Sequence, residues 1–441
     1  MIERIDVNIA GGLDIPLPRM VPVRQKVRAT RVDNIPETVS EQFRRPEIAS
    51  KIKPGQRIAV GCSSRGIANI QVIVKAVVDG IKALGGEPFL FPAMGSHGAS
   101  NAEGQRQVLE DYGLTGERVG ASIRATMDTR ILGQLDSGVP VHADAYAAEA
   151  DGIVLVNRIK PHTSFRGDIE SGVVKMMTIG MGKIRGATAL HSQGMDHFPV
   201  VLPEAARLIM REAPFRFGIG IVENAHDDTM LVEAIAAEHL LQREAVLQAM
   251  AKEAMGRLAI DDIDVLVIDE MGKNISGAGF DPNVTGRNNR GIDGFDTPRV
   301  KRIVVLDLTD ASHGNAAGLS LADVITMKLF RKIDFSAFYA NIIASAYLDG
   351  GAVPLIMNTS REAVSLAVKS VPRVESLDCR VVRVRNTLEV THLEVSETLA
   401  EELRHDSRFD VLGEPEPWTF DEQGELTAAR AEALHAAGGG S

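Results

Sequence analysis

The sequence predicts an α/β protein of two domains, each built on a largely parallel β-sheet, with the active site in the cleft between them. Short apolar runs alternate with longer segments of helical periodicity, and this alternation restarts near residue 258. The length of 441 residues also exceeds that of one typical domain. The predicted domains are residues 1–257 and 258–435, and residues 436–441 form a flexible tail.

In the first predicted domain, short apolar runs indicate strands at residues 57–62, 87–94, 152–159 and 218–222. Apolar positions recur at helical spacing over residues 70–84, and Gly85 and Gly86 end that helix. A second helix is expected at residues 102–111. Alanines and interspersed charges indicate that a helical stretch over residues 231–258 links the two domains.

The second predicted domain begins with strands at residues 264–269 and 302–308. A loop rich in Gly, Asn and Asp separates them, at residues 272–295, and a loop of this length is usually functional or mobile. Helices are expected at residues 321–330 and 361–368. No internal repeat is evident.

Composition narrows the class of protein. Hydrophobic residues make up 44% of the chain and charged residues 24%, which is typical of a globular protein. The net charge of -11 gives no reason to expect binding to nucleic acid or to an anionic membrane. Only two cysteines and no signal-like apolar run are present, so we expect a cytoplasmic protein. Because soluble enzymes are commonly homo-oligomers, a homo-oligomer is the expected state if the chain is an enzyme.

Polar residues follow three of the predicted strands, at the edge where ligands bind parallel sheets. The first strand is followed by Ser63, Ser64, Arg65 and Gly66, the second by His97, and the third by His162. Each alone has an ordinary explanation, since a serine often caps a helix and a loop histidine is often solvated. Their coincidence at one edge favours a site.

Residues 163–191 contain several glycines and two lysines, Lys175 and Lys183. The segment is not a phosphate-binding P-loop, because Met177 stands where that motif has Gly and Ile184 where it has Ser or Thr. The chain also lacks a dinucleotide-binding glycine motif after its first strand, a nucleophile elbow and a zinc-protease motif. The 226–228 segment is interpreted as a polar turn, and residues 312–315 as either a ligand loop or a turn.

The order and spacing of five residues resemble the lactate racemases that use a nickel-pincer nucleotide. These residues are Arg65, His97, His162, Lys175 and His191. The resemblance covers roughly residues 50–230, and its most specific feature is the interval of sixteen residues between the lysine and the last histidine. It implies that Lys175 binds the cofactor covalently, that His191 is the one protein ligand to nickel, and that His97 and His162 are catalytic acid/bases.

The same resemblance implies that Arg65 binds the cofactor or polarises the substrate, and that the nucleotide phosphate lies near Ser63, Ser64 and Gly66 at a helix N-terminus. Lys183 is the nearest competitor for the cofactor lysine, but it lies only eight residues from His191. The cofactor is expected to be a pyridinium thioamide or thiocarboxylate mononucleotide carrying nickel.

The sequence departs from the racemase pattern in ways that indicate a divergent branch. Cys62 stands where those racemases carry an Asp, and the interval from His162 to Lys175 is about three residues longer than expected. The second domain lacks the Tyr-Gln pair and following Lys of the racemase site, and it has Lys273, Asn274 and Arg287 in that region as candidate substrate-binding residues. Their polarity suits a hydroxylated substrate such as a sugar acid.

The sequence therefore predicts a racemase or epimerase of a 2-hydroxy acid that transfers a hydride to and from the cofactor. Two other classes stay open. One is a non-catalytic homologue that binds the cofactor, and the other is a nickel-independent hydrolase or lyase that uses the same histidine pair.

Overall fold

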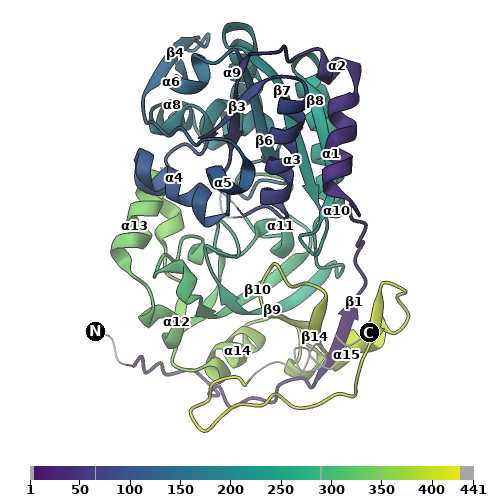
Figure 1. The fold of residues 1–441 in the computed structure, drawn as a ribbon. Helices are drawn as coiled ribbons and strands as arrows, with labels where there is room; N and C mark the ends of the chain where they lie inside the picture. The colour runs from purple at the N-terminus through teal and green to yellow at the C-terminus, as the bar shows by residue number, and fades with distance from the viewer. Residues whose placement is uncertain (1–3, 65, 289–290, 346, 428–441) are drawn as a thin grey trace. The chain divides into compact units, whose positions relative to one another are not determined.

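The computed structural model describes residues 4–64, 66–288, 291–345 and 347–427 (Figure 1). The described residues form two compact units. One unit is Arg28–Met255, and the other combines the described parts of Met1–Val27 and Gly256–Ser441. Both have mixed α/β structure with mostly parallel strands, which confirms the predicted fold class.

The Arg28–Met255 unit contains a five-stranded sheet in the order β3-β2-β6-β7-β8. The first four strands are parallel and β8 is antiparallel to β7. The bounds of the five strands are Glu87–Pro92 for β3, Arg57–Cys62 for β2, Gly152–Arg158 for β6, Phe215–Glu223 for β7 and Thr229–Ala236 for β8. Because β2 lies between β3 and β6, the loops after these three strands lie side by side at one edge of the sheet.

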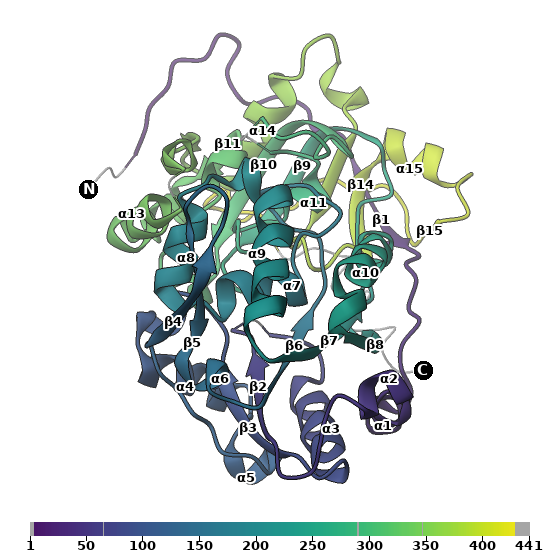
Figure 2. The same cartoon turned by 90° about the horizontal axis from the view of Figure 1, so that it is seen from above.

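Alternate residues of the strands face opposite sides of this sheet. On β6, Val154 and Val156 pack with helices α1 (Ile35–Arg44) and α3 (Ile70–Ala83). Ile153 and Leu155 pack on the other side with α9 (Phe198–Glu212) and α10 (Leu240–Ala254). Figure 2 shows the two helical layers with the sheet between them. Burial on both faces explains why these strands are continuous apolar runs in the sequence.

The other elements of this unit are short. They are α2 (Pro46–Ala49), η1 (Gly98–Ser100), α4 (Ala102–Asp111), α5 (Gly116–Val119), the hairpin of β4 (Thr129–Gln134) and β5 (Pro140–Asp144), α6 (Ala145–Ala148), α7 (Val173–Lys175), the π-helical turn η2 (Met176–Gly180), α8 (Lys183–His191), η3 (Met195–His197) and η4 (Ala237–His239). Together, α7, η2 and α8 carry the segment that the sequence marks as dense in glycine and lysine.

The second unit has an eight-stranded sheet in the order β12-β11-β10-β9-β13-β14-β1-β15. The strands from β12 to β13 are parallel, and β14, β1 and β15 continue the sheet antiparallel. Their bounds are Leu355–Met357 for β12, Val324–Thr326 for β11, Arg299–Leu308 for β10, Asp262–Met271 for β9, Val381–Val384 for β13, His392–Ser396 for β14, Met20–Gln25 for β1 and Phe409–Val411 for β15.

Helix α14 (Ser360–Lys369) packs on this sheet through Ala363, Val364 and Ala367, which lie in one core with Val265 and Val267 of β9. The other helices of the unit are α11 (Pro282–Thr285), α12 (Met327–Arg331), α13 (Phe335–Ala344), α15 (Glu397–Leu403), η5 (Asp310–Ser312), η6 (Leu319–Leu321), η7 (Leu348–Gly351) and η8 (Ser376–Asp378).

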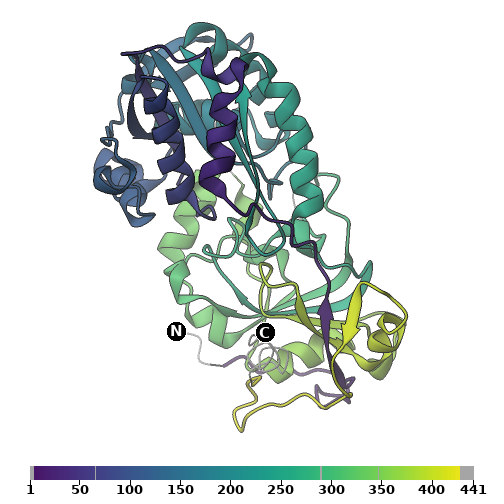
Figure 3. The same ribbon diagram turned by 45° about the vertical axis from the view of Figure 1, so that its right-hand side comes forward.

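The structure differs from the sequence prediction at three places. Strand β1 pairs with β14 and β15, with Met20 opposite Ser396, so the first residues of the chain do not belong with residues 28–255 as the predicted 1–257 domain supposed. Figure 3 shows this purple strand beside the yellow C-terminal strands. The segment predicted as one helix at 231–258 contains strand β8 before α10, and the helix predicted at 321–330 contains strand β11 before α12. The predicted tail at 436–441 lies outside the described residues.

Candidate functional site

The loop after β3 carries His97 and is fixed by backbone bonds. The N–H of Gly95 donates to the carbonyl of Gly180 at 2.9 Å, which ties the loop to the π-helical turn. The buried amide of Gln105, on α4, donates to the carbonyls of Gly95 and His97 at 2.8 and 3.1 Å. Ser64, in the loop after the neighbouring strand β2, forms a hydrogen bond through its Oγ to His97 Nδ1. Two of the predicted strand ends are therefore in direct contact.

A buried ion pair lies beneath this loop. Lys183 Nζ is 3.0 Å from Asp144 Oδ2, and both side chains are fully buried. The same ammonium donates to Gln105 Oε1 at 3.0 Å and to the carbonyl of Pro92 at 2.5 Å. Burial lowers the pKa of Lys183 and raises that of Asp144, and the attraction between the two charges opposes both shifts. Lys183 thus connects α8, the hairpin and the His97 loop, which is a structural role.

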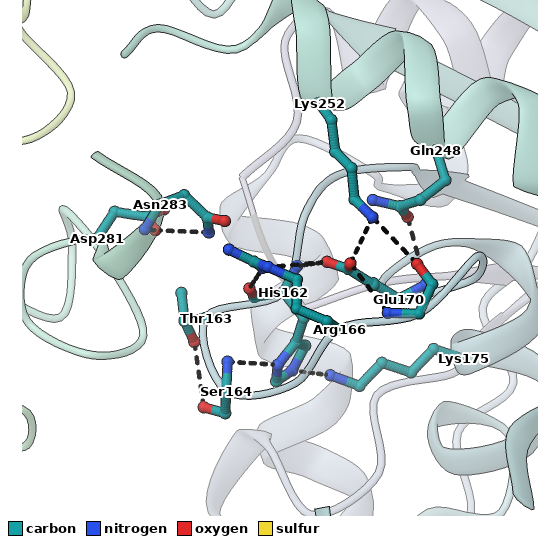
Figure 4. Close-up of polar contacts among 11 residues, drawn as sticks. His162, Thr163, Ser164, Arg166, Glu170, Lys175, Gln248, Lys252, Asp281 and Asn283 are labelled. Atoms are coloured by element: carbon teal, nitrogen blue, oxygen red, sulfur yellow. Dashed lines mark hydrogen bonds and ion pairs between the residues drawn. The ribbon is translucent and has the colours of Figure 1, made fainter. Parts of the chain in front are cut away.

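The loop after β6 carries His162, and its conformation depends on Glu170 (Figure 4). The fully buried carboxylate of Glu170 accepts from the N–H of His162 at 2.7 Å and from the N–H of Gly167 at 3.2 Å. Lys252 of α10 lies 2.6 Å from the same carboxylate, and Arg166 lies 3.5 Å from it. Opposite charges on both sides of a buried carboxylate offset its desolvation. Glu170 therefore holds the backbone of His162 in place.

His162, Lys175 and His191 come together in one part of this unit. Lys175 Nζ lies 2.6 Å from His162 Nε2. The His162 ring packs on Phe165, with ring centroids 4.4 Å apart, and Phe165 packs edge-on against Phe198 at 5.4 Å. Phe198 in turn contacts the His191 ring at 5.2 Å. Two phenylalanines thus join the predicted acid/base to the predicted metal ligand.

The surroundings of His191 favour the neutral form of its imidazole. Burial lowers its pKa, and an ammonium at Lys175 would lower it further, while the hydrogen bond from Nδ1 to the carbonyl of Ala187 at 2.6 Å acts in the opposite direction. Because Nδ1 carries the proton that it donates to this carbonyl, the lone pair of the neutral ring is on Nε2. This is the state in which a histidine binds a metal.

The segment after β2 was predicted to bind a phosphate at a helix N-terminus, and the structure supports this prediction only in part. Helix α3 begins at Ile70 with Asn69 as its N-cap residue, so Ser63 and Ser64 do not cap it. The N–H of Ala68, just before the helix, donates to the Glu223 carboxylate at 2.7 Å. A phosphate at this helix N-terminus would therefore meet a carboxylate. Arg65 lies outside the described residues.

Ser63 and Gly66 remain suitable for binding an added group. Ser63 Oγ is buried and has no hydrogen-bond partner among the residues that the structure describes. Gly66 is exposed. An unpaired buried hydroxyl is costly, because it has lost its hydrogen bonds to water. Ser63 is therefore the polar side chain of this loop that is best placed to bind an added group.

Of the candidate substrate residues in the second unit, Lys273 and Asn274 follow the carboxyl end of β9, whereas Arg287 lies beside the start of β10. Lys273 Nζ donates to Asn341 Oδ1 at 2.9 Å, and Asn274 Oδ1 accepts from Thr309 Oγ1 at 2.6 Å. Arg287 instead pairs with Asp323 at 2.5 Å and also donates to backbone carbonyls, so its guanidinium ties the loop to the sheet. Residues 312–315 form a turn in which the Asn315 side chain accepts from Ala317 N at 3.1 Å.

Glu244 is a buried acid that sequence reasoning missed. Its carboxylate accepts from the N–H of Val174 at 3.0 Å, at the start of the short helix that carries Lys175. Its burial could have been predicted from the sequence, because Leu240, Leu247 and Ala251 mark the buried face of α10 and Glu244 lies on that face. Glu170 and Gln105 gave no comparable signal, because Glu170 lies in a loop and Gln105 shares the buried face of α4 with a single apolar residue, Leu109.

Glu244→Gln is expected to change how stability depends on pH. Burial raises the pKa of Glu244 from its ordinary 4.5 to about 8, so between these values the folded chain holds a proton that the unfolded chain has lost. Stability therefore falls as pH rises across that window, by at most about 1.4 kcal/mol per pH unit from this group. In Glu244→Gln this contribution disappears, because glutamine does not titrate.

Urea denaturation from pH 5 to 8 measures this effect as the difference in slope between wild type and variant. The matched control is Glu253→Gln, since Glu253 is exposed on the same helix. It should keep the wild-type slope. Equal slopes for Glu244→Gln and wild type would contradict the prediction.

Comparison with known proteins finds a matching family profile and a similar fold. The profile of the lactate racemase N-terminal domain family matches residues 14–198. These residues are therefore similar to the N-terminal domain of lactate racemases. The lactate racemase apoprotein from Thermoanaerobacterium thermosaccharolyticum has a similar fold, with a TM-score of 0.52 and 12% identity over 83% of this chain and 94% of that chain. No curated protein in the comparison matches the chain in sequence.

The matched residues 14–198 include all the candidate residues of the first unit, from Ser63 to His191, whereas Lys273, Asn274 and Arg287 lie beyond them. Of the candidates that the structure describes, it brings Ser64 to His97 and His162 to Lys175, and it joins His162 to His191 through aromatic rings. In the described ranges, no helix has the length and apolar character needed to cross a membrane. No group of three or more His, Cys, Asp or Glu side chains suited to a metal occurs within those ranges.

Proposed function

We propose that this chain is a racemase or epimerase of 2-hydroxy acids that uses a nickel-pincer nucleotide attached at Lys175. The observation that supports this most is the assembly of His162, Lys175 and His191 within the lactate racemase domain. It combines an amine for attachment, an imidazole for metal binding and a second imidazole for proton transfer.

The side chains at this place fit such a cofactor. His191 would supply its Nε2 lone pair to nickel, for which imidazole is a suitable ligand. Lys175 would hold the cofactor through its Nζ. The buried hydroxyl of Ser63, which has no partner among the described residues, would donate to a polar group of the nucleotide. Ser64, Gly66 and Arg65 remain predicted contacts of the nucleotide, and Arg65 alternatively polarises the substrate.

The chemistry that the group supplies when bound is reversible acceptance of a hydride, which avoids removing a proton from a very weak carbon acid. The chain's own task is then to move the hydroxyl proton. A histidine with a pKa near neutrality can take this proton and return it. His97 and His162 follow β3 and β6, the strands on either side of β2, and this separation supports a role for each on a different side of the substrate. Ser64 orients His97, and Glu170 fixes His162.

Intact mass measurement tests the attachment. The chain is produced in a host that makes the pincer nucleotide, together with Lys175→Ala and the control Lys75→Ala, in which an exposed lysine of α3 is lost. We expect an adduct of nucleotide size on wild type and on the control and none on Lys175→Ala. The loaded protein should interconvert the enantiomers or epimers of a 2-hydroxy acid, assayed over lactate and a panel of sugar acids.

Other outcomes identify the alternatives. Activity in protein made without the cofactor pathway, retained in Lys175→Ala, would indicate a nickel-independent hydrolase or lyase. An adduct without turnover of any 2-hydroxy acid would indicate a non-catalytic homologue. Turnover of small aliphatic acids alone would exclude the preference for hydroxylated substrates.

A further inference from the structure

The hydrogen bonds of His162 determine where its proton lies. Ser164 donates its backbone N–H to His162 Nδ1 at 3.0 Å, and Lys175 Nζ lies 2.6 Å from His162 Nε2 (Figure 4). A backbone N–H can only donate, so Nδ1 must contribute a lone pair. A neutral imidazole has one ring proton, and in His162 this proton must therefore be on Nε2.

This assignment fixes the state of Lys175. The Nε2–H of His162 donates a hydrogen bond, so its partner at 2.6 Å must accept one. An ammonium has three donor hydrogens and no lone pair, whereas an uncharged amine has a lone pair. We propose that, in the chain without cofactor, His162 holds Lys175 as an uncharged, nucleophilic amine that reacts with an electrophilic acyl or thioacyl group.

The surroundings favour the uncharged form. Lys175 is half-buried, and its neighbours Val173, Val174 and Met176 are fully or almost fully buried apolar residues. Desolvation of this kind is a recognised way to activate a lysine. The hydrogen-bond pattern and the apolar surroundings thus favour the same state.

Acylation would change both residues. The Nζ lone pair attacks the acyl carbon, an N–C bond forms, the leaving group departs with its electron pair, and a proton passes from nitrogen to water. The lone pair of the resulting amide or thioamide is delocalised and no longer accepts a hydrogen bond. The His162 Nε2–H then loses this acceptor and can donate to another oxygen. Attachment at Lys175 would in this way prepare His162 for acid catalysis.

The reactive amine follows from the contacts of His162, and only the identity of the natural electrophile rests on the proposed function. Limited acetylation of the cofactor-free chain with acetic anhydride at pH 7 measures the reactivity of each lysine by peptide mass spectrometry. At this pH an ordinary lysine has less than about 0.1% of its amine uncharged. We expect Lys175 to react at least tenfold faster than the exposed Lys75, despite its partial burial.

Two variants test the role of His162. His162→Phe keeps an aromatic ring against Phe165 but removes Nε2, and His162→Gln offers an oxygen that accepts from an ammonium. Both should lower the acetylation rate of Lys175 at least tenfold relative to Lys75, with unchanged melting temperature as the check on folding. His226→Phe, which replaces an exposed histidine in the turn after β7, is the matched control and should leave Lys175 as reactive as in wild type.

Equal rates for Lys175 and Lys75 in wild type, or an unchanged Lys175 rate in both His162 variants, would overturn the inference. The experiments distinguish a failure of this inference from a failure of the proposed function. A reactive Lys175 without a nucleotide adduct in the loading host would count against the function alone. An adduct on a lysine of ordinary reactivity would count against the inference alone.

Discussion

Lys183→Met is expected to lower the free energy of unfolding of the Arg28–Met255 unit by about 3–5 kcal/mol, because it leaves the buried carboxylate of Asp144 without its counter-charge. The variant also removes a donor from Gln105, whose amide holds the His97 loop. Urea denaturation followed by circular dichroism at pH 7 measures the loss.

Two controls define the origin of this loss. Lys183→Met combined with Asp144→Asn should recover a large part of the stability, since no unpaired charge remains and asparagine can still accept from Ala147 N. Lys75→Met removes an exposed lysine from an ion pair with Asp79 and should change stability by less than about 1 kcal/mol. A Lys183→Met protein as stable as wild type would show that the pair is not needed.

His97→Ala is expected to lower kcat for interconversion of the 2-hydroxy acid by about 10²- to 10⁴-fold, the usual contribution of a general acid/base. Attachment of the nucleotide should persist, because Lys175 contacts His162 and lies on a different segment from His97. Enantiomer-resolved kinetics of the loaded protein, with intact mass measured on the same sample, separate catalysis from attachment.

Ser64→Ala and His226→Ala are the controls for His97. Loss of the Ser64 hydroxyl removes the bond to His97 Nδ1 and should reduce kcat by about tenfold, less than loss of the imidazole itself. His226 is exposed in the turn after β7, and its replacement should leave kcat unchanged. Wild-type kcat in His97→Ala would exclude His97 as an acid/base.

The sequence predicted the helices and strands that depend only on their local residue pattern. Strand β2 and helix α4 have the predicted bounds, because a short buried apolar run and a capped helical segment leave little choice. Strand β8 was taken for a helix, since its alanines and glutamate favour helices. Pairing with β7, where Phe217 lies opposite Ala236, overrides that local preference.

The candidate site was predictable where it depended on chain order. Sheet order brings the loops after β3, β2 and β6 together, so residues at three strand ends could be assigned to one edge. The contacts that support the site could not be predicted this way. Glu170 accepts from the backbone N–H of His162, and Gln105 donates to backbone carbonyls of the His97 loop. The lysines that contact Glu170, Gln105 and Asp144 come from segments far apart from them in the sequence.

The position of β1 affects the order in which the chain can fold during synthesis. Met20 pairs with Ser396 and Val23 with Val411, so the first strand leaves the ribosome long before its partners exist. The Arg28–Met255 unit is continuous in sequence and can complete its sheet while β1 is still unpaired. The candidate site residues of that unit can therefore be assembled early, whereas the eight-stranded sheet forms only after the C-terminal strands have been synthesised.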